Sequence, residues 1–374
     1  MNYVKIKDLS KPQKGIYGIG ASATRYSDDL PQYLRITDID DFGNAPAVLP
    51  TCININIYND WENYLLRKND IVFARTGNST GRNYFCKSIS RDTVFAGFLI
   101  KFTIDSELVI PQYVGYYCQS PAYWNSVKLL FTGSTRANIN AEQYGDLLIP
   151  IINKDIQQHI VNTIGSIDDL IEKNEQFLSK FQSYLVQSYR KYSLECDNTI
   201  EIKALIDRTG KSIKDSQWKE SKVLDLSTMP NGNIFINDFS DGKNFSTNIK
   251  SVNNFDIVYG SIRPYFKKAG FALDVNYIAG TVFSFNVKNA NDYLWVLACI
   301  SSDNFHSFTS INAQGTKMPI INWKTFTSYK IRYDSQIVIT FQKIIKPIFE
   351  ICIIKMRQNR KLKVIKEYLL KKYF

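Results

Sequence analysis

The sequence predicts an α+β fold in which two mixed α/β domains are joined by two long helices that form an antiparallel coiled coil. Residues 133–140 (Gly-Ser-Thr-Arg-Ala-Asn-Ile-Asn) are echoed by residues 315–322 (Gly-Thr-Lys-Met-Pro-Ile-Ile-Asn), and a long helical pattern follows each copy. Upstream, residues 69–75 have a counterpart in residues 255–261. The repeat of roughly 185 residues is far longer than a solenoid period, so it indicates a duplicated domain.

The expected order along the chain is domain, helix, domain, helix. Short β-branched and aromatic runs separated by polar turns predict strands in both domains, with a helical stretch at residues 111–127. In the second domain we expect loops at 238–244 and 286–292, and a buried helix or strand at 294–300. The expected ranges are 1–154 and 197–334 for the domains, and 155–196 and 335–374 for the helices.

The first long helix carries a heptad seam, with spacings that alternate between four and three residues. Such a seam is typical of a coiled coil. A polar Asn at one inner position costs stability but fixes the register when it meets a polar partner. The seam comprises Ile160, Ile164, Ile167, Ile171, Asn174, Leu178, Phe181 and Leu185.

The second long helix has the same spacing at Ile345, Phe349, Cys352, Met356 and Asn359. Beyond Asn359 the apolar residues slip by one place, which predicts a stammer that overwinds the coil. Within this pattern Pro347 predicts either a kink or the true start of the helix. The slipped seam would comprise Leu362, Ile365, Leu369 and Tyr373.

Charge favours antiparallel pairing of the two helices. Acidic residues lie in the first half of helix one and basic residues in the last half of helix two, so antiparallel packing brings them together. We expect Asn174 and Asn359 to face each other; the alternative is two unrelated amphipathic helices that each pack on their own domain. The charged residues are Asp168, Asp169, Glu172 and Glu175, and Lys363, Lys366, Lys371 and Lys372.

Length and composition fit two globular domains, because 374 residues with 44% hydrophobic content are too many for one ordinary core. The net charge of +11 indicates an acidic partner, of which nucleic acid is the obvious candidate. Much of the excess lies in the last helix, so it could instead pair with an acidic protein surface or form a solvated face. Six cysteines without a C-x-x-C pair, no leader and no membrane-spanning run favour a cytoplasmic protein.

The sequence carries no recognisable catalytic chemistry, so we expect no catalytic residue, no metal site and no cofactor in this chain. Its two histidines, His159 and His306, lack neighbours at ligand spacing. The Gly-rich run 18–23 lacks the flanking strand and helix of a dinucleotide loop, and residues 76–81 lack the Lys of a P-loop. The Asn/Asp-Pro-Pro-aromatic tetrapeptide of amino-methyltransferases is also missing.

Basic, Gly-rich loops recur at matching places in the two domains, and we interpret them as DNA-binding loops. Their backbone N–H groups and hydroxyls suit phosphate oxygens, while Arg and Asn can pair with guanine and adenine edges. The alternative is that Gly-Thr turns merely connect strands. The candidates are Arg75, Thr76, Asn78, Ser79, Arg82, Thr132, Ser134, Thr135, Arg136 and Asn138 in the first domain, and Arg263, Tyr265, Lys267, Lys268, Thr316 and Lys317 in the second.

With these segments the chain resembles the specificity (S) subunits of type I restriction-modification systems over essentially its whole length. The second half is more divergent, with Ser261 in place of Arg75 and Arg332 in place of Pro150. The resemblance rests on residues 34–39, 70–77 with Gly81, and 132–135, and then on Ile139, Leu147, Ile149, Pro150, Gln157, Ile160, Ile164, Ile167, Asp168 and Ile171.

The resemblance implies two target-recognition domains that each read half of a split site in double-stranded DNA, with the helices as spacer. It also implies two methyltransferase (M) subunits, which methylate adenine with S-adenosylmethionine, and restriction (R) subunits that join to cleave. The cofactor would then belong to the partner. Two alternatives stay open: a self-contained restriction or modification enzyme, and a DNA- or RNA-binding scaffold outside restriction-modification.

Overall fold

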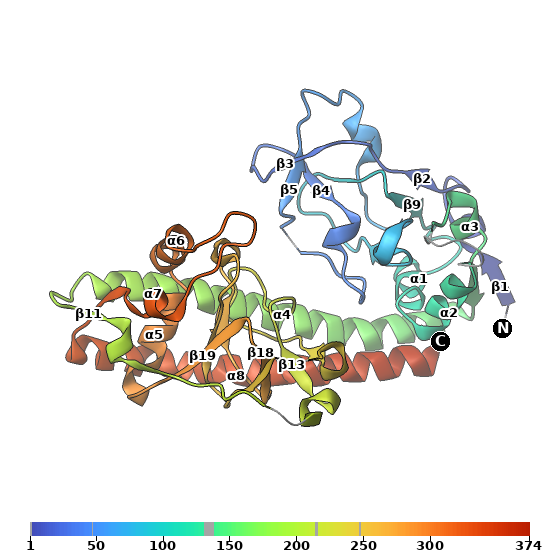
Figure 1. The fold of residues 1–374 in the computed structure, drawn as a ribbon. Coiled ribbons are helices and arrows are strands. Elements are labelled where there is room, and N and C mark those ends of the chain that lie inside the picture. The colour runs from blue at the N-terminus through green and yellow to red at the C-terminus, as the bar shows by residue number, and fades with distance from the viewer. Residues whose placement is uncertain (1, 47, 131–137, 214–215, 247) are drawn as a thin grey trace. The chain divides into compact units, whose positions relative to one another are not determined.

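The computed structural model describes residues 2–46, 48–130, 138–213, 216–246 and 248–374 (Figure 1). The chain forms two compact units. Unit 1 comprises Met1–Asp169 and Lys363–Phe374, and unit 2 comprises Leu170–Leu362. Each unit therefore contains one mixed α/β domain and a part of both long helices. Within the described ranges, none of the helices combines the length and the apolar content that crossing a membrane would require.

Unit 1 is built on two four-stranded sheets and one two-stranded sheet. One sheet has the order β2-β9-β6-β7 and is antiparallel; the second has the order β3-β5-β4-β8, with β4 and β8 parallel; β1 pairs with β10. The strands are β1 Asn2–Lys5, β2 Ile16–Tyr17, β3 Ala23–Arg25, β4 Gln32–Leu34, β5 Thr51–Ile53, β6 Asp70–Ala74, β7 Asn83–Phe85, β8 Thr93–Phe95, β9 Leu99–Thr103 and β10 Leu148–Ile151, and the short helices are α1 Pro111–Tyr117, α2 Pro121–Leu129 and α3 Ala141–Gly145.

Unit 2 repeats this plan. Its sheets have the orders β12-β19-β16-β17 and β14-β13-β18-β15, with β13 and β18 parallel, and β11 pairs with β20. The strands are β11 Thr199–Glu201, β12 Ile206–Arg208, β13 Lys222–Leu224, β14 Ser240–Asp241, β15 Ile249–Ser251, β16 Ile257–Gly260, β17 Ala269–Phe271, β18 Tyr277–Ala279, β19 Val282–Val287 and β20 Lys330–Arg332, and the short helices are α5 Tyr293–Ile300, α6 Asp303–Ile311 and α7 Trp323–Thr327.

The second domain departs from the predicted loops at two places. Residues 238–244 contain the short strand β14, and β19 continues to Val287, so both loop predictions are partly wrong. Both strands lie in sheets whose hydrogen bonds outweigh the weak strand tendency of their polar residues. The apolar run 294–300, which the sequence left open between helix and strand, is helical within α5 and entirely buried.

The duplicated segments fold alike. On the central strands β6 and β16, Ile71 pairs with Phe102, and Ile257 pairs with Phe285. After these strands, the N–H of Ile139 donates to the carbonyl of Arg75 (2.9 Å), and the N–H of Ile321 donates to that of Ser261 (3.0 Å). Positions 75 and 261 are therefore equivalent, as the sequence repeat predicted.

The Asn that ends each repeated loop caps a short helix. The side chain of Asn140 accepts a hydrogen bond from the Gln143 N–H at the start of α3 (2.9 Å), and Asn322 accepts one from the Thr325 N–H at the start of α7 (2.8 Å). Each amide oxygen satisfies one of the N–H groups that a helix leaves unpaired at its first turn. The repeated Asn thus fixes where the loop ends and the helix begins.

A tight turn introduces each central strand. Asn69 and Phe255 have left-handed backbones (φ 74° and 67°) at the equivalent position. The buried carboxylates that follow hold the turn, because Asp70 accepts from the Arg67 N–H (2.7 Å) and Asp256 from the Asn253 N–H (3.0 Å). Such side-chain acceptors satisfy backbone donors that the turn removes from the sheet.

The long helices are α4 (Lys154–Ser193) and α8 (Ser335–Tyr373), which lie antiparallel to each other in each unit (Figure 1). In unit 2 the rings of Phe181 and Phe349 lie 6.1 Å apart, and in unit 1 those of His159 and Tyr373 lie 6.4 Å apart. The expected seam is buried at Ile160, Ile164, Asn174, Leu178, Phe181, Leu185, Ile345, Phe349, Cys352, Met356 and Asn359, whereas Ile167 and Ile171 are half-buried. The alternative of two unrelated surface helices is wrong.

A polar layer interrupts the seam in unit 2, where the sequence placed it. Asn174 Nδ2 donates to Asn359 Oδ1 (2.8 Å) and to Gln358 Oε1 (3.0 Å), while its Oδ1 accepts from Lys355 Nζ (2.9 Å). Both Asn residues are buried. The predicted facing of Asn174 and Asn359 is confirmed.

The predicted stammer is wrong. Ile365 is 46% exposed, whereas Lys366 is 8% exposed and lies one heptad beyond Asn359. The seam keeps its phase because Lys366 Nζ pairs with Asp168 Oδ1 (2.7 Å), and the Tyr116 hydroxyl also donates to that carboxylate (3.0 Å). A buried Lys that is paired in this way can occupy a position where apolar residues are expected.

The helix start suggested by Pro347 is also wrong, since α8 begins at Ser335 and continues through Pro347. Proline removes one N–H from the helical ladder, which leaves the carbonyl four residues earlier without its usual donor. The surrounding turns on both sides are anchored in the core by Ile345 and Phe349, and this packing outweighs the local cost.

We expect Asn174→Leu to destabilise the full chain by about 1 to 3 kcal/mol, because it leaves Asn359 buried without its donor. Adding Asn359→Leu should recover part of that loss, so the two changes should not add. Equilibrium denaturant unfolding of both single variants and the double variant measures the coupling. Gln176→Leu, on the exposed face of α4, is the control and should have little effect. Additive losses would contradict a direct Asn–Asn interaction.

Candidate nucleic-acid interface

The first candidate loop begins where β6 ends. Thr76 forms an isolated antiparallel bridge with Asn138, so the loops predicted from separate parts of the sequence meet here. Gly77 takes a left-handed backbone (φ 72°) and begins a single turn of 3-10 helix that includes Asn78 and Ser79. Asn78 is exposed. The predicted residues Thr132, Ser134, Thr135 and Arg136 lie outside the described residues.

Arg75 lies at the base of this loop and stacks on an aromatic ring. Its guanidinium carbon is 4.9 Å from the centre of the Tyr17 ring, and the Tyr17 hydroxyl accepts from the Ala141 N–H at the start of α3 (3.1 Å). Arg75 has no ion pair with any residue in the described ranges. Sequence reasoning missed Tyr17, because its partners are remote in the chain and only the register of β2 brings them together.

Arg82, in contrast, is engaged within the domain. Its Nε donates to Asp41 Oδ1 (2.6 Å), and one terminal nitrogen donates to the Ile39 carbonyl (3.2 Å). These bonds tie the end of the loop to residues 39–41. In the structure Arg82 therefore positions the loop, and any direct contact with DNA would have to compete with Asp41.

The second domain brings its candidate loops together in the same way. Ile262 forms an isolated bridge with Ile320, at positions equivalent to Thr76 and Asn138, and the Arg263 N–H donates to the Pro319 carbonyl (2.7 Å). Thr316 and Lys317 are exposed beside it. Basic loops at equivalent places in both domains are thus a property of the fold as well as of the sequence.

An aromatic pair forms the tip of the 263–268 loop. Arg263 and Lys267 both have left-handed backbones (φ 50° and 54°), and the turn between them exposes Tyr265 and Phe266 by 50% and 38%. Their ring centres are 4.8 Å apart. Exposed aromatic rings can stack on nucleic-acid bases. Tyr265 is one of the residues predicted to bind DNA, whereas Phe266 was not predicted.

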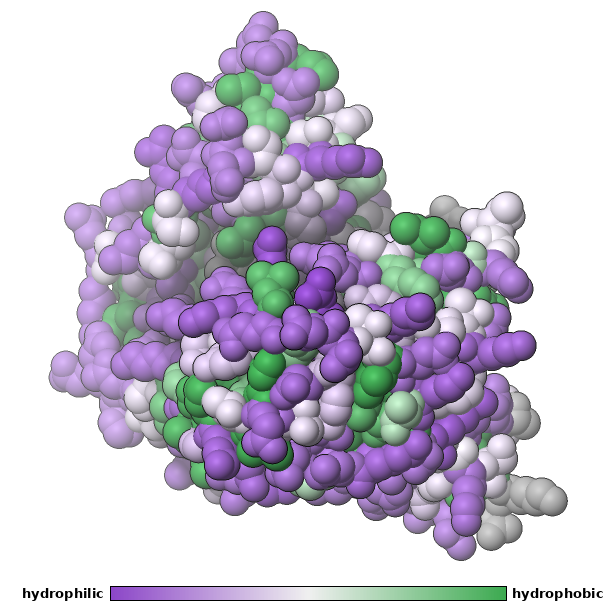
Figure 2. Space-filling view, turned by 90° about the vertical axis from the view of Figure 1, so that its left-hand side faces the viewer, coloured by the Kyte–Doolittle hydropathy of each residue, from purple (hydrophilic) through white to green (hydrophobic). Residues whose placement is uncertain are grey.

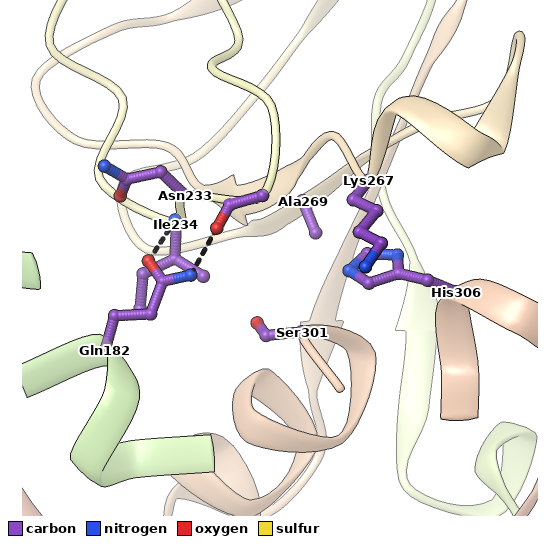
Figure 3. A pocket seen from close by; sticks show the side chains of 8 residues that line it. Gln182, Asn233, Ile234, Lys267, Ala269, Ser301 and His306 are labelled. Atoms are coloured by element: carbon purple, nitrogen blue, oxygen red, sulfur yellow. Dashed lines mark hydrogen bonds between the residues drawn. The ribbon is translucent and has the colours of Figure 1, made fainter. Parts of the chain in front are cut away.

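Both lysines of this loop interact with other groups of the same domain. Lys267 Nζ pairs with Asp303 Oδ1 (2.6 Å), and its side chain lies beside His306 (Figure 3). Lys268 Nζ donates to the Leu226 carbonyl, and burial lowers the pKa of this lysine. Exposed ion pairs such as Lys267–Asp303 contribute little to stability, so Lys267 could exchange its partner for a phosphate at small cost.

Lys267 lines a small pocket between α4 and the domain (Figure 3). Gln182 on α4 donates to the Gly232 carbonyl (2.5 Å) and accepts from the Ile234 N–H (2.9 Å). His306 is buried, with Nδ1 3.3 Å from the Tyr259 hydroxyl, and burial lowers its pKa to about 4. His306 is therefore a neutral core residue at physiological pH, and in the described ranges no three His, Cys, Asp or Glu side chains gather as a metal site would require.

The face drawn in Figure 2 is predominantly polar. On the face drawn in Figure 2, hydrophilic residues cover most of the area and apolar residues gather in small separate patches. Patches of this kind are ordinary on proteins. Specific contact by the domains is therefore more consistent with charged and hydrogen-bonding groups than with an apolar face.

The architecture is similar to that of solved structures. An S subunit of a type I restriction-modification system from M. genitalium aligns with 100% of this chain and 96% of its own, at 15% identity and a TM-score of 0.55. The fold is that of a type I S subunit. No protein-family profile and no curated protein matches the sequence.

Two further structures align at lower similarity. The HsdS subunit from Thermoanaerobacter tengcongensis aligns over 99% of this chain and 95% of its own, with 12% identity and a TM-score of 0.34. A chain from a structure of type I R-M complex assembly and conformational transition aligns over 99% and 96%, with 10% identity and a TM-score of 0.36. The S-subunit fold confirms the predicted α+β class with two domains and a long-helix coiled coil.

We expect His306 to make the stability of this S-subunit fold depend on pH. Its pKa of about 4 lies below the ordinary 6.5, so the unfolded chain takes up the proton first as pH falls. The contribution is complete above about pH 6.5 and is lost towards pH 4, by on the order of 3 kcal/mol. Denaturant unfolding of His306→Gln across this range should show a flatter profile. Gln176→Leu, which changes an exposed, uncharged residue of α4, is the control and should keep the wild-type slope; equal slopes in all three proteins would contradict the assignment.

Proposed function

We propose that the chain is the DNA-sequence specificity subunit of a type I restriction-modification complex. The observation that carries the proposal is the recurrence of a basic loop pair at the same place in two like domains, Thr76 beside Asn138 and Ile262 beside Ile320. Two like binding modules suit a partner that offers two like sites, and the S-subunit fold supports DNA as that partner. Each domain then reads one half of a bipartite sequence.

The two domains share a frame and differ in their loops, which suits two unlike half-sequences. The first domain's loop exposes Asn78, whereas the second domain's loop exposes the aromatic pair at 265–266. Base recognition depends on which side chains line the groove, whereas the supporting sheet only positions them. Changes confined to loops can therefore change the sequence that is read without changing the fold.

We further propose that the long helices set the spacing between the half-sites and dock two M subunits. An antiparallel coil of this kind is stiff, so a distance set by its length cannot easily adapt to another target. Chemistry would belong to the partners: the M subunits would hold S-adenosylmethionine and methylate adenine, and R subunits would join for cleavage. The exposed lysines of α8, such as Lys343 and Lys361, would meet either DNA phosphates or an acidic partner surface.

The decisive experiment is co-expression of the chain with a type I methyltransferase (M) subunit from the same genome, followed by mapping of modified adenines in the host genome. We expect one motif made of two short half-sequences separated by an unread gap of fixed length. Expression of the methyltransferase alone is the control and should give no such motif. If the pair modifies no split adenine motif, the proposed function is wrong.

We expect the unread gap to follow the length of the coil. Inserting one heptad beside Asn174 and one beside Asn359 lengthens the coil by about 10.5 Å, which corresponds to about three base pairs. Both half-sequences should stay the same, since the domains are unaltered. A variant whose heptads are replaced without a change of length is the control. An unchanged gap in the lengthened variant would rule out the spacer role.

A further inference from the structure

Arg208 at the end of β12 is a stacked arginine that sequence reasoning overlooked. Its guanidinium carbon is 5.2 Å from the centre of the Trp323 ring and 5.6 Å from that of Phe283. Arg208 is exposed, and the described part of the chain provides no ion pair for it. This distinguishes it from Arg82 and Lys267, which each pair with a carboxylate. Stacking holds a guanidinium plane in place while leaving its N–H groups available to a ligand.

The register of the sheets identifies the equivalent place in unit 1. Arg208 lies opposite Phe285, and Gly15, next to the Ile16–Lys101 pair, lies opposite Phe102. A side chain at Gly15 would meet Ile100 and Ala141. These two residues are the counterparts of Phe283 and Trp323, because β19 repeats β9 and α7 repeats α3.

Each unit thus stacks a guanidinium on an aromatic ring at the first residue of a short helix, which is α3 in unit 1 and α7 in unit 2. In unit 1 the arginine is Arg75, at the end of β6, and the ring is Tyr17. In unit 2 the position of Arg75 is occupied by Ser261, while Arg208 and Trp323 supply the arginine and the ring from other elements. The same pairing of a guanidinium with an aromatic ring is therefore present at the equivalent short helices of both domains, although the sequence repeat does not preserve it.

A second cation lies near Gly210, two residues after Arg208: Lys250 Cδ is 3.6 Å from the position that a Cβ on Gly210 would take. Lys250 on β15 donates to the Gly280 carbonyl (3.3 Å), and its pKa is lowered by burial and then by the charge of Arg208. The nearby carboxylates are engaged elsewhere: Asp207 pairs with Lys288, and Asp256 accepts from the Thr209 hydroxyl. Two neighbouring cations that repel each other gain most from an anion placed between them.

We propose that Arg208, assisted by Lys250, binds a backbone phosphate of DNA beside the half-site of the second domain, and that Arg75 does the same for the first. The inference rests on the proposed function. A phosphate is favoured over a base edge because the stack recurs in domains whose reading loops differ, and phosphates are what two unlike half-sequences have in common. Arg208 then anchors the domain on the duplex, and the loops read the bases.

The test uses the chain in complex with its methyltransferase and a labelled duplex that carries the mapped site. Arg208→Gln keeps the stem over Trp323 and removes the charge, so it should still fold. We expect affinity at 0.15 M salt to fall about fivefold and the salt slope to fall by about one. The methylated motif should not change. Arg75→Gln should give the same loss, and the double variant about twenty-five-fold.

Two controls make the result specific. Lys203→Ala removes one exposed positive charge from unit 2 and should leave affinity nearly unchanged. Arg208→Lys keeps the charge and should retain most of the binding, as expected for a phosphate contact. Relaxed specificity at one base of the second half-site in Arg208→Gln or Arg208→Lys would assign Arg208 to base reading and overturn the proposal.

The outcomes also separate this inference from the proposed function. If the wild-type complex binds no split site, the proposed function itself fails. If the wild-type complex binds its site and Arg208→Gln behaves like Lys203→Ala, only the phosphate contact is refuted. Unfolding measurements on each variant exclude loss of the fold as the cause of weaker binding.

Discussion

Buried polar contacts between α4 and α8 fix the register on which the rest of the structure depends. In unit 2 Asn174 meets Asn359, and in unit 1 Asp168 meets Lys366. A seam of only apolar residues would tolerate a slip of one heptad, because each residue would meet another of the same kind. A slip here would leave the buried ammonium group of Lys366 and the two buried amides without their partners, at a cost of several kcal/mol. One antiparallel register is therefore strongly preferred.

Each domain is attached to the helices of its own unit by hydrogen bonds to the backbone and, in unit 2, also by an ion pair between side chains. In unit 1 Gln157 on α4 accepts from the Ile110 N–H (3.0 Å) and donates to the Ile152 carbonyl (2.8 Å). In unit 2 Arg357 makes a two-point pair with Asp274, and Arg360 donates to the Ile236 carbonyl (3.1 Å). Bonds to backbone carbonyls and N–H groups hold a whole segment, so the domain cannot turn on the helix without breaking them. A loop held on such a base keeps its direction.

The elements that the sequence predicted are those with local or periodic signals. The duplication, the heptad seam and the facing Asn pair were predicted because each depends on spacing along the chain. The stammer was wrong for a related reason: hydrophobicity favoured Ile365, and only the three-dimensional pairing with Asp168 explains why Lys366 takes the inner position. Tyr17, Arg208 and Trp323 could not be predicted, since strand register brings together residues that are far apart in the sequence. The predicted loop residues 132–136 lie outside the described residues, and their role stays a prediction.

Ser261 occupies the position of Arg75 in the second domain. This difference separates two requirements, one for a positive charge and one for a contact with a base, which the sequence alone does not distinguish. At the level of the repeat, Ser261 looks like the loss of a DNA contact from the second domain. The register shows that a guanidinium still lies beside α7, supplied by Arg208 on another strand. A charge required only for electrostatic attraction can come from any strand that reaches the same place, whereas a base contact depends on the direction of a particular side chain. The two domains can therefore differ in every loop while each keeps a cation beside the equivalent short helix, α3 or α7.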